Sequence, residues 1–178
     1  MPLVWRLARP EFAEHLDGEG SRIEGGRWNP IGLPALYTSE LLSLSVLEVH
    51  VHLPPQMRDA LPVLRAVQIS IPDMIGITRV SVERLAELLA ADDPLAVCQA
   101  VGEAWISRGR DLVFQVPSVL VPEETNLILN PAHPRMREVK IVSSRPFHFD
   151  RVLLCGRPEP HHSPFFSHCS CGIGSPTW

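Results

Sequence analysis

Short, interrupted apolar runs limit the folds that this chain can adopt. The 178 residues include 18 Pro and 11 Gly, and most of the strand-like runs are bounded by Pro, Gly or Asn. Because proline cannot donate a hydrogen bond to a β-ladder, long central strands are not expected. Short strands are predicted instead at Leu3 to Leu7, Ala35 to Tyr37, Val63 to Ile71, Asp111 to Val116, Ser118 to Val121, Leu127 to Leu129 and Glu138 to Val142.

Helical patterns lie between these runs, at Ser39 to Leu53, Val82 to Ala91 and Pro94 to Arg108. Ser81 and Asp93 are predicted N-caps, and Gly109 is a predicted stop. Strands and helices do not alternate regularly, which predicts the α+β class. No Gly-rich turn follows the first strand, so neither a Rossmann dinucleotide-binding unit nor a P-loop is supported.

Length and charge limit the class of protein. The chain is long enough for one domain with a core. A formal net charge of -4 argues against direct binding of nucleic acid. The first residues lack a signal-peptide pattern, and no stretch reaches the roughly 20 apolar residues of a membrane helix. A cytoplasmic protein without membrane contact is therefore predicted.

The composition changes after residue 153, and residues 154–178 are rich in Pro, Ser, Gly, His and Cys. They show no apolar periodicity, which predicts a tail outside the folded core. The Cys-x-Cys and His-His spacings in this tail match no structural zinc site, so no metal is predicted. Three of the four cysteines lie there, and a disulfide framework is not expected.

Glu48 stands among apolar positions on the helical wheel of Ser39 to Leu53, whose other faces are mostly apolar too. Such a helix is predicted to be interior, where an unpaired carboxylate is costly or takes up a proton. Glu48 is therefore interpreted as a catalytic or ligand-binding carboxylate. The alternative is a structural pair with an arginine, for which Arg6 and Arg27 are available.

A Gly- and Pro-rich segment, Gly25 to Pro34, leads into Tyr37 and concentrates aromatic and charged side chains. Glycines before Arg27 let the backbone approach a ligand, and its guanidinium matches phosphate, although an ordinary loop salt bridge is an equal alternative. Trp28 is interpreted as a core anchor. Tyr37 either presents its ring to a flat heterocycle or fills the core with its hydroxyl bonded.

A second dense segment surrounds Ser118, which lies between Pro117 and Pro122. No Gly-x-Ser-x-Gly elbow surrounds this serine, so a positioning role is favoured over that of a hydrolase nucleophile. Asn126 and Asn130 are interpreted first as turn formers and second as ligand contacts.

Taken together, these segments resemble the RES domain, the toxin half of the RES and Xre toxin-antitoxin modules of bacteria. The resemblance runs in the family's order through residues 3–153, and residues 154–178 depart from it. It rests on Val4-Trp5-Arg6, Gly25 to Pro30 with Tyr37-Thr38-Ser39, Leu47-Glu48-Val49, Val116-Pro117-Ser118 with Asn126 and Asn130-Pro131, and Phe147 to Arg151. A RES domain over residues 1–153 is the resulting prediction.

This resemblance implies a mixed sheet with flanking helices, related to ADP-ribosyltransferases, and an enzyme that consumes NAD+ as substrate without a cofactor. The implied catalytic residues are Glu48, Arg27, Tyr37 and Ser118, and the implied substrate-binding residues are Arg6, Arg27, Tyr37 and Asn126. In these roles the arginines would hold the phosphates or a ribose, and Tyr37 would pack on the nicotinamide ring. Glu48 would be the central acid, and Ser118 would complete the pocket.

Three reactions stay open under this resemblance: hydrolysis, phosphorolysis, or transfer of ADP-ribose to a cellular protein. A nucleotide- or partner-binding module without turnover is the alternative from another class. The resemblance also implies a cognate Xre-type helix-turn-helix antitoxin and a homodimer.

Overall fold

The computed structural model describes residues 1–52 and 63–150, of which Met1–His148 form one compact unit. The predicted tail at 154–178 and its boundary therefore lie outside the described residues. The element order is β1 (Leu3–Ala8), α1 (Pro10–Ala13), α2 (Glu19–Glu24), β2 (Leu36–Ser39), α3 (Leu42–His52), β3 (Leu64–Ser70), β4 (Ile77–Arg79), α4 (Val82–Leu89), α5 (Pro94–Arg108), β5 (Val113–Pro117), β6 (Thr125–Leu129), the 3-10 helix η2 (Pro134–Glu138) and β7 (Lys140–Phe147).

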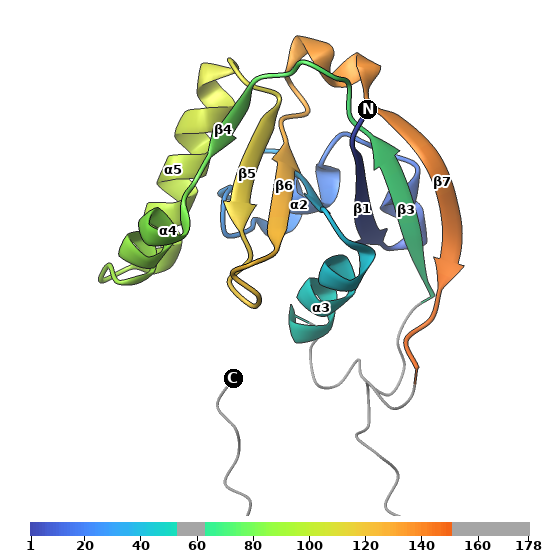
Figure 1. Cartoon of the computed structure of the whole chain (residues 1–178), viewed down its shortest axis with the longest axis horizontal. Coiled ribbons are helices and arrows are strands. Elements are labelled where there is room, and N and C mark those ends of the chain that lie inside the picture. The colour runs from blue at the N-terminus through green and yellow to red at the C-terminus, as the bar shows by residue number, and fades with distance from the viewer. Residues whose placement is uncertain (53–62, 151–178) are drawn as a thin grey trace, which may run out of the picture. The chain divides into compact units, whose positions relative to one another are not determined.

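Within the described residues, seven strands form one mixed sheet in the order β4-β5-β6-β2-β1-β3-β7. Only β4 and β5 run parallel, and the other neighbours are antiparallel. The ladder between β1 and β2 has one register pair, Trp5 opposite Ser39, whereas β1 and β3 pair along their whole length. The two parts of the sheet therefore meet at a short junction (Figure 1). This arrangement with its helices confirms the predicted α+β class.

Buried side chains form two clusters, because successive residues of a strand point to opposite faces of the sheet. Val113 belongs to one cluster with Val4, Leu36 and Leu129. Its neighbour Phe114 belongs to the other, which is built from the 28–37 segment, α4, α5, β5 and β6. The Phe114 ring meets Trp28 edge-on and stacks on Trp105, with ring centroids 5.1 Å apart in both pairs. The prediction of Trp28 as a core anchor is therefore confirmed.

Both α4 and α5 begin where the capping signals predict, and α5 also ends where predicted, whereas α4 ends at Leu89, two residues before its predicted end at Ala91. Ser81 Oγ accepts from the Arg84 N–H, and Asp93 Oδ1 accepts from the Ala96 N–H. Gly109 ends α5 in the left-handed conformation that glycine favours. Both helices lie beside β4 and β5, at one end of the sheet (Figure 1). None of the helices in residues 1–52 and 63–150 combines the length and apolar character that a membrane span requires.

The prediction of an interior helix at Ser39 to Leu53 is wrong in two respects. Ser39 is the last residue of β2, and α3 begins at Leu42. Its buried residues are Leu44 and Ser45, whereas the apolar side chain of Val51 is 48% exposed. One side of α3 packs on the β1 strand, where Ser45 Oγ donates to the Trp5 carbonyl over 3.0 Å. The other apolar positions are left outside the core.

The predicted strand Ser118 to Val121 is a turn. Ser118 Oγ accepts from the N–H groups of Leu120 and Val121, over 3.1 and 3.3 Å, and its own N–H donates to Glu124 O. These local bonds replace a ladder that the flanking prolines would interrupt. The sequence patterns also missed α1, α2, β4 and η2, which are short, and the C-terminal half of β7.

Candidate functional site

The Glu48 carboxylate is the centre of a polar cluster that joins a helix, a turn and a strand. Its Oε1 atom accepts from Ser118 Oγ over 2.9 Å and from Asn126 Nδ2 over 2.6 Å. Asn126 Oδ1 in turn accepts from Ser39 Oγ over 2.7 Å. Ser118 is fully buried, Ser39 is nearly so, and Glu48 is half-buried. Residues 39, 48, 118 and 126 are thus brought into one chain of hydrogen bonds.

The donors to Glu48 are a hydroxyl and an amide. Within residues 1–52 and 63–150, no arginine forms an ion pair with this carboxylate. The alternative interpretation, a structural pair with Arg6 or Arg27, is therefore wrong. No described group bonds to the second oxygen of Glu48, Oε2. The cluster thus holds the carboxylate by one oxygen, Oε1, and the described residues do not bond to the other.

Strand pairing places further side chains on the same face of the sheet as this cluster. Ser39 is opposite Asn126 on one side and opposite Trp5 on the other. Paired residues point to the same face, as do residues two apart in one strand. Tyr37 therefore lies on this face about 7 Å along β2 from Ser39. An aromatic residue flanks the carboxylate cluster in each of two directions.

The Tyr37 hydroxyl is fixed by the Gly-rich segment. It donates to Asn29 Oδ1 over 2.7 Å and accepts from the Trp28 N–H over 3.0 Å. Burial raises the pKa of this hydroxyl, and the nearby Arg27 charge opposes the shift to a lesser degree. A side chain at Gly26 would meet the Tyr37 hydroxyl at 2.5 Å, so this position needs glycine. The ring is thus held with its hydroxyl bonded, which is one of its two predicted arrangements.

The same segment is supported by α5 and by Asn29, which is fully buried. Asn29 Nδ2 donates to the carbonyls of Ser21 and Leu33. From α5, Gln99 Nε2 donates to Gly26 O over 3.0 Å. A Cβ atom at position 102 would overlap the Trp28 carbonyl, so the helix packs directly on the segment's backbone. This support is the reason why the segment can hold side chains rigidly.

Arg27 projects from this supported segment. Its positive charge favours the ionised forms of the buried Cys98 thiol and of the Tyr37 hydroxyl. Burial raises the pKa of Cys98, and the Arg27 charge opposes that shift. No carboxylate of the described chain pairs with Arg27. The interpretation of Arg27 as a loop salt bridge is therefore wrong, and its charge is available to an anion.

Arg6 is placed differently from the other predicted site residues. Its Nη1 atom donates to the carbonyls of Phe12 in α1 and of His15, over 3.2 and 2.9 Å, and so holds α1 and the residues that follow it. Burial lowers the pKa of the guanidinium, and Asp17 opposes this in part. Because successive side chains of a strand point to opposite faces of the sheet, Arg6 shares a face with Val4, and Trp5 lies on the other face. The structure thus gives Arg6 a structural contact outside the hydrogen-bonded cluster, and its predicted substrate role stays a prediction.

Three residues at this site had no predicted role: Ser39, Gln99 and Trp5. Ser39 and Trp5 are within segments that carried the family resemblance, but only the strand register shows that they face Asn126 and each other. Gln99 is on a helix far along the chain, and nothing in its local pattern indicates a contact with Gly26. Asn130, the second predicted turn former, is buried and donates to Ile106 O over 3.1 Å.

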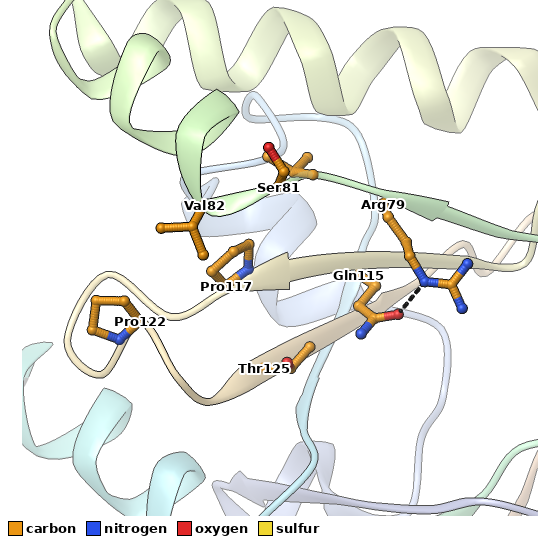
Figure 2. Close-up of a pocket in the computed structure, with 8 residues that line it drawn as sticks. Arg79, Ser81, Val82, Gln115, Pro117, Pro122 and Thr125 are labelled. Atoms are coloured by element: carbon orange, nitrogen blue, oxygen red, sulfur yellow. Dashed lines mark hydrogen bonds between the residues drawn. The ribbon is translucent and has the colours of Figure 1, made fainter.

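A groove of about 200 Å³ lies near the end of β5 and the start of α4 (Figure 2). Its lining includes Val82, Pro117 and Thr125, and Arg79 Nε donates there to Gln115 Oε1 over 2.9 Å. Gln115 and Thr125 alternate with Val116 and Asn126 along their strands, so the groove lies on the other face of the sheet. It is therefore separate from the Glu48 cluster.

The fold and the site define an α+β protein with a mixed sheet and a half-buried, hydrogen-bonded glutamate. The same fold occurs in a chain of the crystal structure of the M. tuberculosis MbcT-MbcA toxin-antitoxin complex. That similarity has a TM-score of 0.64 and 22% sequence identity, and it covers 82% of this chain and 83% of that chain.

Sequence comparison gives the family. The RES domain model matches residues 3–150. A "Prs ADP-ribosylating toxin" from Sphingobium sp. (strain YBL2) is 36% identical over 157 residues, which are 84% of this chain and 95% of that protein. A "Toxin Res" from Photorhabdus laumondii is 34% identical over 130 residues, which are 72% of this chain and 81% of that protein. The chain belongs to the RES domain family.

Proposed function

We propose that this protein is a cytoplasmic toxin that cleaves the nicotinamide-ribose bond of NAD+. The observation that carries the proposal is the Glu48 carboxylate, held through Oε1 by Ser118 and Asn126 with Oε2 free of described partners. The names of the relatives, an ADP-ribosylating toxin and a toxin Res, support this class of activity.

The chemistry of the bond explains why a fixed carboxylate is useful. As the bond from ribose C1′ to the nicotinamide nitrogen breaks, its electron pair leaves with the ring and positive charge develops on the ribose. A carboxylate held close by gains interaction in that transition state, as in glycoside hydrolysis. Oε2 of Glu48 would face the ribose, while Ser118 and Asn126 prevent the carboxylate from turning away. A water oxygen then bonds to C1′ and releases a proton, which yields ADP-ribose.

The other side chains support binding of NAD+. Arg27 would hold the pyrophosphate, because a guanidinium without a carboxylate partner matches phosphate oxygens. Tyr37 would pack beside the nicotinamide ring, since its hydroxyl is already fixed by Asn29 and Trp28. Arg6 bonds to the carbonyls of Phe12 and His15 outside the cluster, so its role at the phosphates is proposed on the family resemblance alone. Binding energy from the phosphates would hold the leaving ring in reactive geometry.

Two other acceptors of ADP-ribose give related reactions. Inorganic phosphate in place of water would give a phosphorylase, and a protein side chain would give an ADP-ribosyltransferase. The name of the Sphingobium relative favours the transferase as the second candidate. A binding module without turnover is the alternative from another class.

We also propose an antitoxin partner for this chain. The chain with the similar fold is part of a toxin-antitoxin complex, which supports this proposal. A helix-turn-helix antitoxin of the Xre type and a homodimer remain proposals that rest on the family resemblance.

Nicotinamide release from NAD+ by the purified full chain tests the activity. We expect the wild type to release nicotinamide, and Glu48→Gln to lower kcat by about 100-fold or more with an unchanged melting temperature. Glu103→Gln, on the exposed side of α5, is the matched control and keeps wild-type activity. Wild-type activity in Glu48→Gln would contradict the assigned role.

Products made from adenylate-labelled NAD+ distinguish the acceptors. Free ADP-ribose indicates hydrolysis, its phosphate ester indicates phosphorolysis, and label on protein in a cell extract indicates transfer. A shift of the melting temperature by NAD+ without any nicotinamide release would instead support the binding module.

A further inference from the structure

We propose that Ser39 is a positioning residue that holds the Asn126 amide in place and, through it, the Glu48 carboxylate. Ser39 is the last residue of β2 and lies directly opposite Asn126 of β6. Its hydroxyl donates to Asn126 Oδ1 over 2.7 Å, and Asn126 Nδ2 donates to Glu48 Oε1 over 2.6 Å. Ser39 does not itself contact the carboxylate.

The asymmetry of the amide fixes which of its ends faces Glu48 and which faces Ser39, because an ionised carboxylate only accepts hydrogen bonds. The two ends of an asparagine side chain have almost the same shape, but one accepts hydrogen bonds and the other donates them. If the Asn126 amide turned over, its oxygen would face Glu48 Oε1, and two acceptors would lie at hydrogen-bond distance without a proton between them. Once Glu48 selects the orientation with Nδ2 toward it, the hydroxyl at position 39 holds the amide there by supplying the proton that Oδ1 accepts.

The burial of Ser39 increases the expected consequence of removing its hydroxyl. Ser39 is 4% exposed, so water replaces its hydroxyl poorly when that group is removed. Asn126 Oδ1 would then lack its donor, and the amide could rotate. Glu48 would keep Ser118 as its donor but would lose the second bond that fixes Oε1. Oε2 would no longer be held in one direction.

The neighbouring residue provides a matched control. Thr38 is also buried, and its hydroxyl also bonds across β2 and β6, to the Leu127 carbonyl. It points to the opposite face of the sheet from Ser39. Thr38→Val therefore removes a comparable cross-strand hydrogen bond without touching the chain of bonds that leads to Glu48.

The kinetic test rests on the proposed cleavage of NAD+. In nicotinamide release, Ser39→Ala should lower kcat about tenfold with little change in KM, a loss at the low end of that caused by removing the hydrogen-bond partners of metal-ligating side chains. Ser39→Thr keeps a hydroxyl and should recover most of the loss, and Thr38→Val should keep the wild-type kcat. Ser39→Ala should have no further effect in an Asn126→Ala background, because the residue through which it acts is gone. Wild-type kcat in Ser39→Ala, or equal losses in Ser39→Ala and Thr38→Val, would overturn the proposal.

An NMR readout is independent of the reaction. The chain has three asparagines, so the side-chain amide signals of Asn126 can be assigned by their loss in Asn126→Ala. Ser39→Ala should shift both signals and speed their exchange with water, whereas Thr38→Val and Ser39→Thr should leave them near their wild-type positions. Unchanged Asn126 signals in Ser39→Ala would overturn the inference. If the wild type leaves NAD+ intact, the proposed function is refuted. The Asn126 amide signals then still test whether Ser39 holds the Asn126 side chain.

Discussion

Asn126 binds Glu48 through the shortest hydrogen bond in the cluster, 2.6 Å from Nδ2 to Oε1. The bond joins β6 to α3, which are separated by 78 positions in the chain. With Ser118 on the same oxygen, it holds one half of the carboxylate inside the protein and leaves the other half available. This relationship makes Glu48 the centre of the predictions that follow.

Replacement of Ser118 distinguishes a positioning residue from a nucleophile. Ser118→Ala should lower kcat by about 10- to 100-fold and leave measurable activity, because Asn126 still bonds to Glu48. It should also destabilise the protein by about 1 kcal/mol, since the Leu120 and Val121 N–H groups lose their acceptor. Nicotinamide release and urea unfolding measure the two effects. Complete loss of activity in a folded Ser118→Ala protein would favour a covalent role.

Arg27 should act mainly in binding. Arg27→Lys keeps the charge but loses the planar fork, so KM for NAD+ should rise about tenfold with a smaller change in kcat. Arg22→Lys is the control, because Arg22 lies on α2 in an exposed pair with Glu19 and faces no site residue. Steady-state kinetics of both variants provide the measurement. An equal change in both would indicate a general effect of replacing arginine by lysine and would contradict the role of Arg27.

The close packing of α5 on the Gly-rich segment can be tested by replacing a glycine at the contact and a glycine elsewhere with alanine. Gly102→Ala should destabilise the protein by about 1–3 kcal/mol, because the new methyl group overlaps the Trp28 carbonyl. Gly20 also lies in a helix, and a Cβ atom added there would meet no atom closer than 4.0 Å. Gly20→Ala should therefore stabilise the protein by about 0.5–1 kcal/mol. Urea unfolding at neutral pH measures both. Equal stability of the two variants would contradict the packing described.

Alkaline pH should report on Tyr37, which is the only tyrosine in the chain. Burial raises its pKa above the unfolded value of about 10, so the native state favours the neutral phenol. The resulting stability is fully present below about pH 10 and is lost as pH rises further, because the unfolded chain then ionises first.

Phenolate absorption and urea unfolding across this pH range check the prediction. Absorption should appear together with unfolding, and Tyr37→Phe should lose less stability over the same range. Phenolate that forms in the folded protein near pH 10 would show that the hydroxyl is not protected.

The sequence predicted structural features correctly where they depend on hydrogen bonds between residues close together in the chain. The caps Ser81, Asp93 and Gly109 bound α4 and α5 as expected, since each acts on the backbone within a few residues. The burial of Trp28 was also anticipated. The turn at Ser118 was misread as a strand, because a run of Val and Leu between prolines matches either structure and its hydrogen bonds decide between them.

The sequence by itself determined the α+β class, the family and the residue types of the site, because caps, short apolar runs and ordered motifs are read along the chain. Only the tertiary structure decided which of these residues touch. Strand register brings Ser39 to Asn126, α3 delivers Glu48 to both Asn126 and Ser118, and Arg6 bonds elsewhere. The physical reason is that these contacts join residues as many as 87 positions apart, and no local pattern encodes pairings between distant segments.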